Sequence, residues 1–195
     1  MEFTTNLYKG KKYVTWDLDL TEFKQKSQFY QDLNEFFDSD FLRYYPDDAA
    51  GLAYSVNVVH IASLQELIDF LTPTLTKAFK QLTNKELGVL DRLWANRMHY
   101  GSFGSIHTHL NTVAGQDCKV FTIYLNVPVN SSNLVLIDPD SNYRYQQLIT
   151  NVPEAEQLHI PVHEGMCIMY DGDLPHGVSR HNSNLTRDAL IIECF

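Results

Sequence analysis

The chain has little cysteine, and its cysteines are poorly placed for cross-linking. Its 195 residues contain three of them, Cys118, Cys167 and Cys194, an odd number with no Cys-x-x-Cys spacing. This pattern argues against a disulfide framework and against a cysteine-rich zinc cluster. It favours a reducing compartment, and we expect the protein to be cytoplasmic.

Long apolar runs and basic tracts are also missing. No stretch approaches the roughly 18 apolar residues of a membrane-spanning helix, and the first residues lack the apolar core of a secretory signal. Lys and Arg number 15 against 24 Asp and Glu, which gives a net charge of −9. Surfaces that bind nucleic acid usually carry a patch of Lys and Arg. We therefore expect neither a membrane partner nor a nucleic-acid partner.

Aromatic residues, in contrast, are plentiful. The chain holds 11 Tyr and 11 Phe within a hydrophobic content of 44%, a globular composition that suits a sheet-rich core. The length predicts a single domain over residues 1–195. We expect residues 1–86 to be a mostly helical support and residues 87–195 to be a β-rich catalytic core.

Helical patterns occupy much of the first part. Apolar residues recur at helical spacing over 20–37, and Ser63-Leu64-Gln65-Glu66 has the pattern of a capping box before a second helix. Pro73 predicts a kink in that helix or its division into two. Short strands are predicted at 13–16 and 54–61.

The second part changes to short β-rich segments separated by Gly, Pro, Asn and Asp. The predicted strands are 88–100, 105–110, 119–126, 133–137, 156–162, 165–170, 175–180 and 187–194. This order predicts an α+β, mainly β protein. Its architecture would be a double-stranded β-helix (jelly roll, cupin-like) with the N-terminal helices packed on the major sheet.

Three histidines are spaced like metal ligands. His107 and His109 are two residues apart, so on a strand they point to the same side. His176, on a distant strand, can close one face of a metal, as in mononuclear non-haem iron sites. Neutral imidazoles also bind zinc, copper and nickel, so the histidines alone do not name the metal.

Four other histidines are interpreted as surface or hydrogen-bonded residues: His60, His159, His163 and His181. His99 is near the cluster in sequence, but it alternates with Trp94 and Asn96, so we expect its side chain to point away from the site.

Arg187 follows His176 by eleven residues and opens an apolar run. Its planar guanidinium can bind a carboxylate through two parallel hydrogen bonds. If the two residues lie on consecutive antiparallel strands, Arg187 could hold the far carboxylate of a dicarboxylate such as 2-oxoglutarate. The alternative is a surface ion pair with Asp188 or Glu193.

Together these residues resemble a known family. Trp94-Ala95-Asn96, Gly101 and His107-Thr108-His109 are similar to the W-x-N, G and H-x-H segment of 2-oxoglutarate/Fe(II)-dependent oxygenases, a group common in phages and bacteria. The similarity continues through residues 121–128 and 133–139 to His176 and Arg187. It covers about residues 90–195. More distantly, this half resembles the catalytic domain of prolyl 4-hydroxylases, which holds iron with H-x-D and a second His.

The resemblance implies an oxygenase that hydroxylates a substrate while 2-oxoglutarate is oxidatively decarboxylated to succinate. It implies Fe(II) bound by His107, His109 and His176, with dioxygen as a co-reactant. The residues that it assigns to 2-oxoglutarate are Arg187, Tyr100, Tyr124 and Asn96. Tyr100, Tyr124 and Asn96 could otherwise be ordinary core residues.

One position departs from the pattern. Where the wider superfamily usually has Asp or Glu, this chain has His109, and three neutral ligands leave a metal more positive than a set with a carboxylate. Asp117 is an alternative third ligand. Two other functions stay open, namely a three-histidine cupin-type dioxygenase without 2-oxoglutarate and a non-enzymatic metal-binding jelly roll.

The substrate is not defined by the sequence. The loop 138–152 carries Tyr143, Arg144 and Tyr145, which would suit a small molecule or a peptide equally well. The N-terminal helices could form a homodimer interface, although no coiled-coil heptad supports one.

Overall fold

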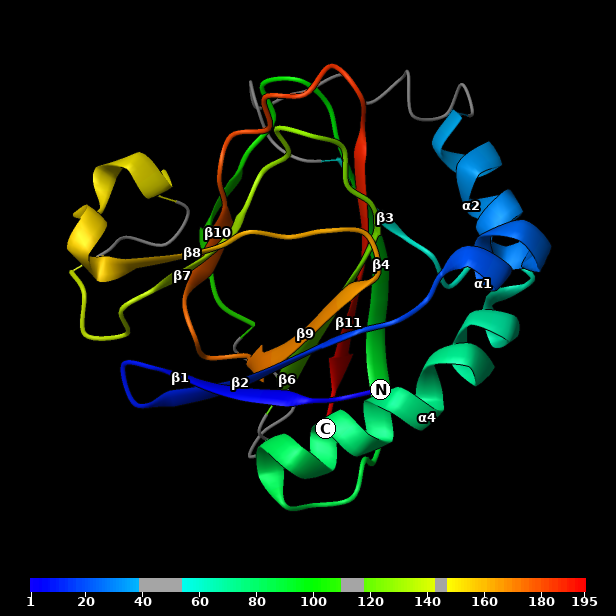
Figure 1. Ribbon diagram of the computed structural model, residues 1–195, viewed down its shortest axis with the longest axis horizontal. Helices are drawn as coiled ribbons and strands as arrows, with labels where there is room; N and C mark the ends of the chain where they lie inside the picture. Colours follow the sequence, from blue (N-terminus) through cyan, green and yellow to red (C-terminus); the bar gives the residue numbers. More distant parts are fainter. Residues whose placement is uncertain (39–53, 110–117, 143–146) are drawn as a thin grey trace.

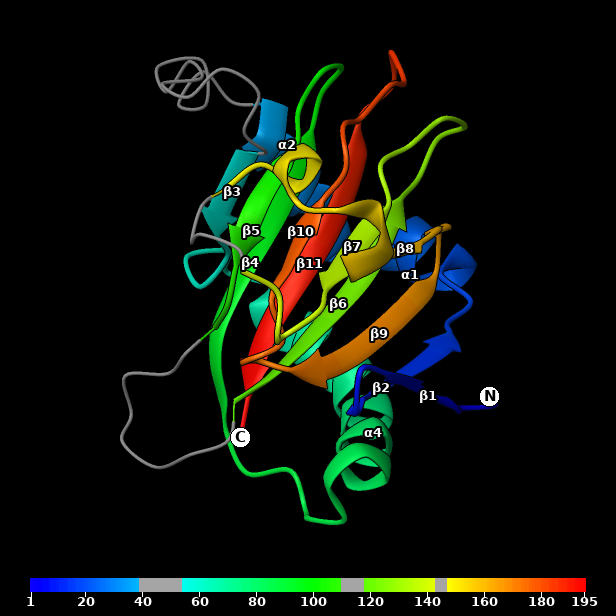
Figure 2. The ribbon, with the colours of Figure 1, turned by 90° about the vertical axis from the view of Figure 1, so that its left-hand side faces the viewer.

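The protein consists of two antiparallel β-sheets that face each other, with helices on the outer side of the larger sheet (Figures 1 and 2). The computed structural model describes residues 1–38, 54–109, 118–142 and 147–195. The larger sheet has the strand order β1-β2-β9-β6-β11-β4-β3 and the smaller has the order β5-β10-β7-β8. The predicted jelly-roll class is confirmed.

The larger sheet is built from β1 (Thr4–Tyr8), β2 (Lys11–Asp17), β3 (Tyr54–Asn57), β4 (Leu90–Met98), β6 (Lys119–Asn126), β9 (Met166–Asp171) and β11 (Arg187–Cys194). The smaller sheet is built from β5 (Gly104–His107), β7 (Leu134–Ile137), β8 (Gln157–Ile160) and β10 (His176–Val178). The helices in the described part of the chain are α1 (Thr21–Lys26), α2 (Gln28–Asp38) and α4 (Leu64–Thr83), with the 3-10 turns η1 (Ile149–Asn151) and η2 (Glu154–Glu156).

Alternation along the central strands separates two cores. On β6, Phe121 and Ile123 point outward and join the cluster that contains the buried face of α4. Val120 and Tyr124, on the opposite face, join a second cluster between the two sheets. Because both faces are covered, β6 is almost continuously buried, as expected for a central strand between two apolar layers. The inward face of this sheet supplies one wall of the site described below.

The N-terminal helices differ from the sequence prediction in their capping. The predicted capping box at Ser63 is wrong, because the Ser63 hydroxyl bonds to Asp32 instead of to its own helix. Glu66 accepts hydrogen bonds from the backbone N–H groups of Gln28 (3.0 Å) and Phe29 (3.2 Å). It therefore caps the first turn of α2, where a negative charge is favourable. Glu66, which the sequence pattern assigned to the cap of its own helix, caps the neighbouring helix α2 instead.

Pro73 does not divide the second helix, since α4 is continuous over its 20 residues. No helix within the described residues is long and apolar enough to cross a membrane.

The connection between β10 and β11 also corrects an expectation. The two strands are consecutive in the chain, but β10 belongs to the smaller sheet and β11 to the larger. His176 and Arg187 therefore face each other across the space between the sheets and are not neighbours in one sheet. This crossing brings a histidine and an arginine to opposite walls of one cavity.

Candidate active site

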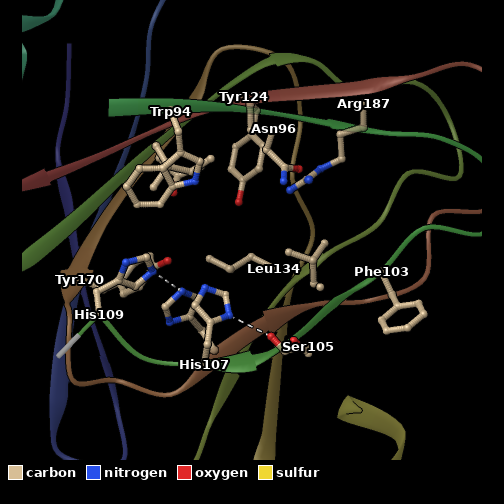
Figure 3. A pocket seen from close by; sticks show the side chains of 16 residues that line it. Trp94, Asn96, Phe103, Ser105, His107, His109, Tyr124, Leu134, Tyr170 and Arg187 are labelled. Carbon is tan, nitrogen blue, oxygen red and sulfur yellow. Dashed lines mark hydrogen bonds between the residues drawn. The ribbon is translucent and has the colours of Figure 1, made fainter. Parts of the chain in front are cut away.

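The three predicted metal ligands come together on the smaller sheet. Strands β5 and β10 pair so that His107 lies directly opposite His176. His109 lies just beyond the end of β5, where its backbone N–H donates to the Gly172 carbonyl at 2.7 Å. One ring nitrogen from each histidine lies within 4.8 Å of the other two (Figure 3). The structure thus assembles a three-nitrogen cluster from two strands and one loop.

Each ring is oriented by an acceptor on its Nδ1 side. His107 Nδ1 lies 2.8 Å from the Ser105 carbonyl, and His176 Nδ1 lies 2.8 Å from the Leu174 carbonyl. A ring that donates through Nδ1 keeps the lone pair of Nε2 free for a metal. The Nε2 atoms of His109 and His176 are 3.2 Å apart. Two nitrogens at about 2.1 Å from one metal and at right angles to it would be about 3 Å apart, so the donor set fits a metal ion.

Burial favours the neutral form of two of these imidazoles, those of His107 and His176. It lowers the pKa of His107, and it lowers the pKa of His176 well below its ordinary value, with a further contribution from the two neighbouring histidines. Neutral imidazole is the form that binds metals, because a protonated ring has no lone pair to give.

The cluster opens into a cavity of about 220 Å³ between the sheets. The larger sheet contributes the wall residues Trp94, Asn96, Thr122, Tyr124, Tyr170, Arg187, Ala189 and Ile191. The smaller sheet and its approach contribute Phe103, Gly104, Ser105, Leu134 and Val178 beside the histidines. The wall is mostly apolar with a few polar groups, as is usual for a small-molecule site.

Arg187 lies on the wall opposite the histidines and is only 2% exposed. Its Nη1 donates to the Met98 sulfur at 3.0 Å, and its guanidinium carbon lies 4.7 Å from the centre of the Tyr124 ring. Among the described residues, its Nε and the Tyr124 hydroxyl have no hydrogen-bond partner. Burial lowers the pKa of Arg187, because a cation is poorly solvated there.

The predicted alternative for Arg187, a surface ion pair, is wrong. Asp188 points to the other face and pairs with Arg97 at 2.7 Å, and Glu193 pairs with His109. Within the described part of the chain, no carboxylate pairs with Arg187. A buried cation with a thioether and a ring beside it is costly unless an anion completes the site.

Two other residues assigned by the resemblance lie at this cavity. Figure 3 shows Asn96 and Tyr124 beside Arg187, with their side chains directed into the space above the histidines. Trp94 stacks on His109, with ring centres 5.5 Å apart and an angle of 20° between the planes. The W-x-N segment of β4 therefore forms one wall of the site.

Tyr100 is a correction, because the structure does not bring it to the cavity. Strand β4 ends at Met98, and the chain then turns through Gly101, whose φ of 86° suits glycine. Tyr100 lies on the outside of this turn and is 69% exposed. Asp117, the alternative ligand, and the loop residues Tyr143, Arg144 and Tyr145 lie outside the described residues.

Sequence reasoning missed two residues at the site. Tyr170 packs edge-on against His176 at 4.9 Å, and the Glu193 carboxylate accepts a hydrogen bond from His109 at 2.7 Å. Alternation could have indicated Glu193, because residues 187, 189, 191 and 193 of one strand share a face. The remaining histidines lie outside the cluster, and buried His181 bonds to the Leu185 carbonyl at 2.7 Å.

A family model described as "Putative 2OG-Fe(II) oxygenase" matches residues 92–192 of this chain. The matched segment contains the histidine cluster and Arg187. A search of curated proteins found no significant match.

Solved structures of similar fold include several oxygenases. The α-ketoglutarate-dependent carbocyclase SnoK from nogalamycin biosynthesis has a TM-score of 0.67 at 13% identity, covering 93% of this chain and 78% of that one. The Pseudomonas putida prolyl-4-hydroxylase has a TM-score of 0.57 at 11% identity, covering 93% and 91%. EctD from S. alaskensis, solved with 2-oxoglutarate and 5-hydroxyectoine, has a TM-score of 0.63 at 11% identity, covering 93% and 71%. At these identities the likeness shows the fold.

Proposed function

This chain belongs to the 2OG-Fe(II) oxygenase family whose model matches it, and on that premise we propose the residues that hold its metal and its co-substrate. The enzyme uses Fe(II), 2-oxoglutarate and dioxygen together with a substrate to be oxidised. When bound, iron and 2-oxoglutarate supply the redox chemistry, in which 2-oxoglutarate is decarboxylated to succinate.

His107, His109 and His176 would hold the iron through their Nε2 atoms. The donor set supports this assignment, because two Nε2 atoms already lie 3.2 Å apart and the Nδ1 atoms of all three rings have acceptors. Acceptors on the far side of a ligand fix its tautomer and orientation before a metal arrives. Three protein ligands also leave coordination positions open for small molecules.

Arg187 would hold the distal carboxylate of 2-oxoglutarate, and this is the observation that carries the proposal. A buried guanidinium with no carboxylate partner in the described chain faces three metal-binding nitrogens across a cavity of about 220 Å³. The Tyr124 hydroxyl, also without a partner there, can donate to the same carboxylate. Asn96 lies on the same wall of the cavity as Arg187 and would contact the co-substrate.

The apolar wall has a second role. Leu134, Val178, Ala189 and Ile191 limit the water that can reach the space between the histidines and Arg187. In a poorly solvated site, the attraction between the guanidinium and a carboxylate is stronger than in water. The chain itself therefore binds, orients and shields the co-substrate.

The substrate we propose is a small molecule or a peptide. The net charge of −9 disfavours a nucleic-acid partner. A homodimer through the N-terminal helices stays a prediction, which sedimentation of the purified protein would check.

Two variants test the site assignment. His107→Ala and His176→Ala should each abolish the oxidation of 2-oxoglutarate to succinate. His181→Ala is the matched control, since it removes a buried histidine outside the cluster. Full turnover by either of the first two variants would contradict the assignment.

A further inference from the structure

Glu193 is a buried carboxylate beside the histidine cluster, and it has no role in the proposed binding of iron or 2-oxoglutarate. It lies near the end of β11 and is 4% exposed. It shares the inward face of that strand with Arg187 and lies six residues further along. Strand residues rise by about 3.3 Å each, so one strand carries a cation to one end of the site and an anion to the other.

The carboxylate contacts one metal-binding histidine directly. Glu193 Oε1 accepts from His109 Nδ1 at 2.7 Å, and both side chains are less than a tenth exposed, at 5% and 8%. Its other oxygen lies 3.8 Å from the Nε of Arg92, whose side chain is 60% exposed. The short, shielded contact is therefore with the histidine, and the contact with Arg92 is long and open to solvent.

Two stacking contacts and one backbone hydrogen bond orient His109 toward Glu193. It is stacked between Trp94, with centres 5.5 Å apart, and His176, with centres 5.0 Å apart and an angle of 6°. Its backbone N–H is bonded to Gly172 at 2.7 Å. Stacking fixes the plane of the ring, but it leaves open which nitrogen carries the proton. The Glu193 carboxylate decides that, because it can only accept.

We propose that Glu193 is a positioning residue that supplies, through His109, the negative charge that this three-histidine set lacks. His109 stands where a carboxylate ligand was expected, and the cluster of potential metal ligands found in the described residues consists of three histidines without a carboxylate. Glu193 places a carboxylate one side chain further out. A carboxylate that accepts from a ligand's N–H makes the ligand more basic and lowers the net charge around the metal.

This inference rests on the proposed metal-binding role of the three histidines. If Glu193 acts through its charge, removal of that charge should change the metal affinity even when the shape of the side chain is kept. A purely structural hydrogen bond would not have this effect.

The test is an anaerobic titration of the purified full-length protein with Co(II), followed by the visible absorption of the bound ion. Glu193→Gln keeps an acceptor oxygen and removes the charge, whereas Glu193→Ala removes both. Loss of such a partner typically weakens metal binding about 10–100-fold. We expect about tenfold weaker binding for Glu193→Gln and a larger loss for Glu193→Ala. Asp188→Asn is the control, since it neutralises a buried carboxylate on the outward face of the same strand.

A second background separates charge from packing. In His109→Asp a carboxylate takes the ligand position, and no imidazole N–H is left to donate to Glu193. Adding Glu193→Gln there should change Co(II) affinity by less than about twofold, because the ring through which Glu193 acts on the metal is gone. A structural role for Glu193 predicts loss in both backgrounds. This pair also decides the matter if Glu193→Ala does not fold.

Two outcomes would overturn the inference. Co(II) affinity within twofold of the wild type in Glu193→Gln would overturn it alone, provided that the wild type binds metal and 2-oxoglutarate. Failure of the wild type to bind Co(II) or Fe(II) would overturn the proposed metal site together with it.

Discussion

Replacement of Arg187 by methionine should weaken 2-oxoglutarate binding without weakening the fold. The guanidinium is 2% exposed, and its Nε has no partner among the described residues. A hydrogen bond to a charged group contributes about 1.5–3 kcal/mol, so a two-bond contact with a carboxylate is worth about 3–6 kcal/mol. At about 1.4 kcal/mol for each tenfold, the Kd for 2-oxoglutarate should rise by about two to four orders of magnitude.

The stability of the ligand-free Arg187→Met variant should be equal to or greater than that of the wild type. An unpaired buried cation opposes folding, so its replacement by an apolar side chain of similar length should be neutral or stabilising, as it often is even for buried ion pairs. Thermal unfolding of the ligand-free protein should therefore show a Tm equal to or above that of the wild type. Anaerobic calorimetry with 2-oxoglutarate and Fe(II) would measure the Kd.

Arg97 is the matched control, because it is also a buried arginine but is paired. It forms an ion pair with Asp188 at 2.7 Å on the outward face of the sheet. Arg97→Met strands that carboxylate, at a cost of about 3 kcal/mol, which lowers Tm by about 6–12 °C for a chain of this size. Its Kd for 2-oxoglutarate should not change. An Arg187→Met variant with unchanged 2-oxoglutarate affinity, or with the instability of Arg97→Met, would refute the reasoning.

Three further predictions concern the same cavity. Tyr124→Phe removes a buried hydroxyl that has no hydrogen-bond partner among the described residues. The Kd for 2-oxoglutarate should rise about tenfold with stability unchanged, and an unchanged Kd would show that Tyr124 does not bind 2-oxoglutarate. His176→Ala should abolish metal binding, whereas His181→Ala should lower Tm and leave the metal affinity unchanged; equal metal affinity in both would contradict the cluster. The pKa values of His107 and His176 are lowered from the ordinary 6.5. Below about pH 6.5 the unfolded chain therefore binds more protons than the folded apo-protein. The free energy of unfolding should fall as the pH drops through and below that value. The double variant His107→Asn/His176→Asn should show a smaller fall in denaturant titrations, and an equal fall would show that other groups cause it.

The β-rich half of the fold could be predicted closely from the sequence. The strands predicted at 119–126 and 187–194 have the observed bounds, because short runs rich in apolar residues, bounded by turn residues, indicate where such strands begin and end. The N-terminal hairpin partner Thr4–Tyr8 was missed, since this edge strand is largely exposed and has no apolar face to reveal it. Capping by Glu66 was misassigned because its partner, α2, is distant in sequence.

The site could be predicted in part. Local spacing brought out His107, His109, His176 and Arg187, but it could not show that β10 and β11 lie in opposite sheets. The chain crosses from one sheet to the other between these two strands, and the residue pattern of each strand carries no signal of that crossing. Tyr100 was also misplaced, because strand β4 ends at Met98 and the chain turns at Gly101, so strand alternation no longer sets the direction of the Tyr100 side chain.

The central claim is that three histidines and Arg187 form one site for iron and 2-oxoglutarate. Anaerobic addition of Fe(II) and then 2-oxoglutarate, followed by absorption spectroscopy, tests it most directly. A metal-to-ligand charge-transfer band should appear only when both are present, at one equivalent of each, and should be lost in His176→Ala and at moderate 2-oxoglutarate concentration in Arg187→Met. Absence of the band in the wild type, or a stoichiometric zinc that resists exchange with iron, would contradict the account.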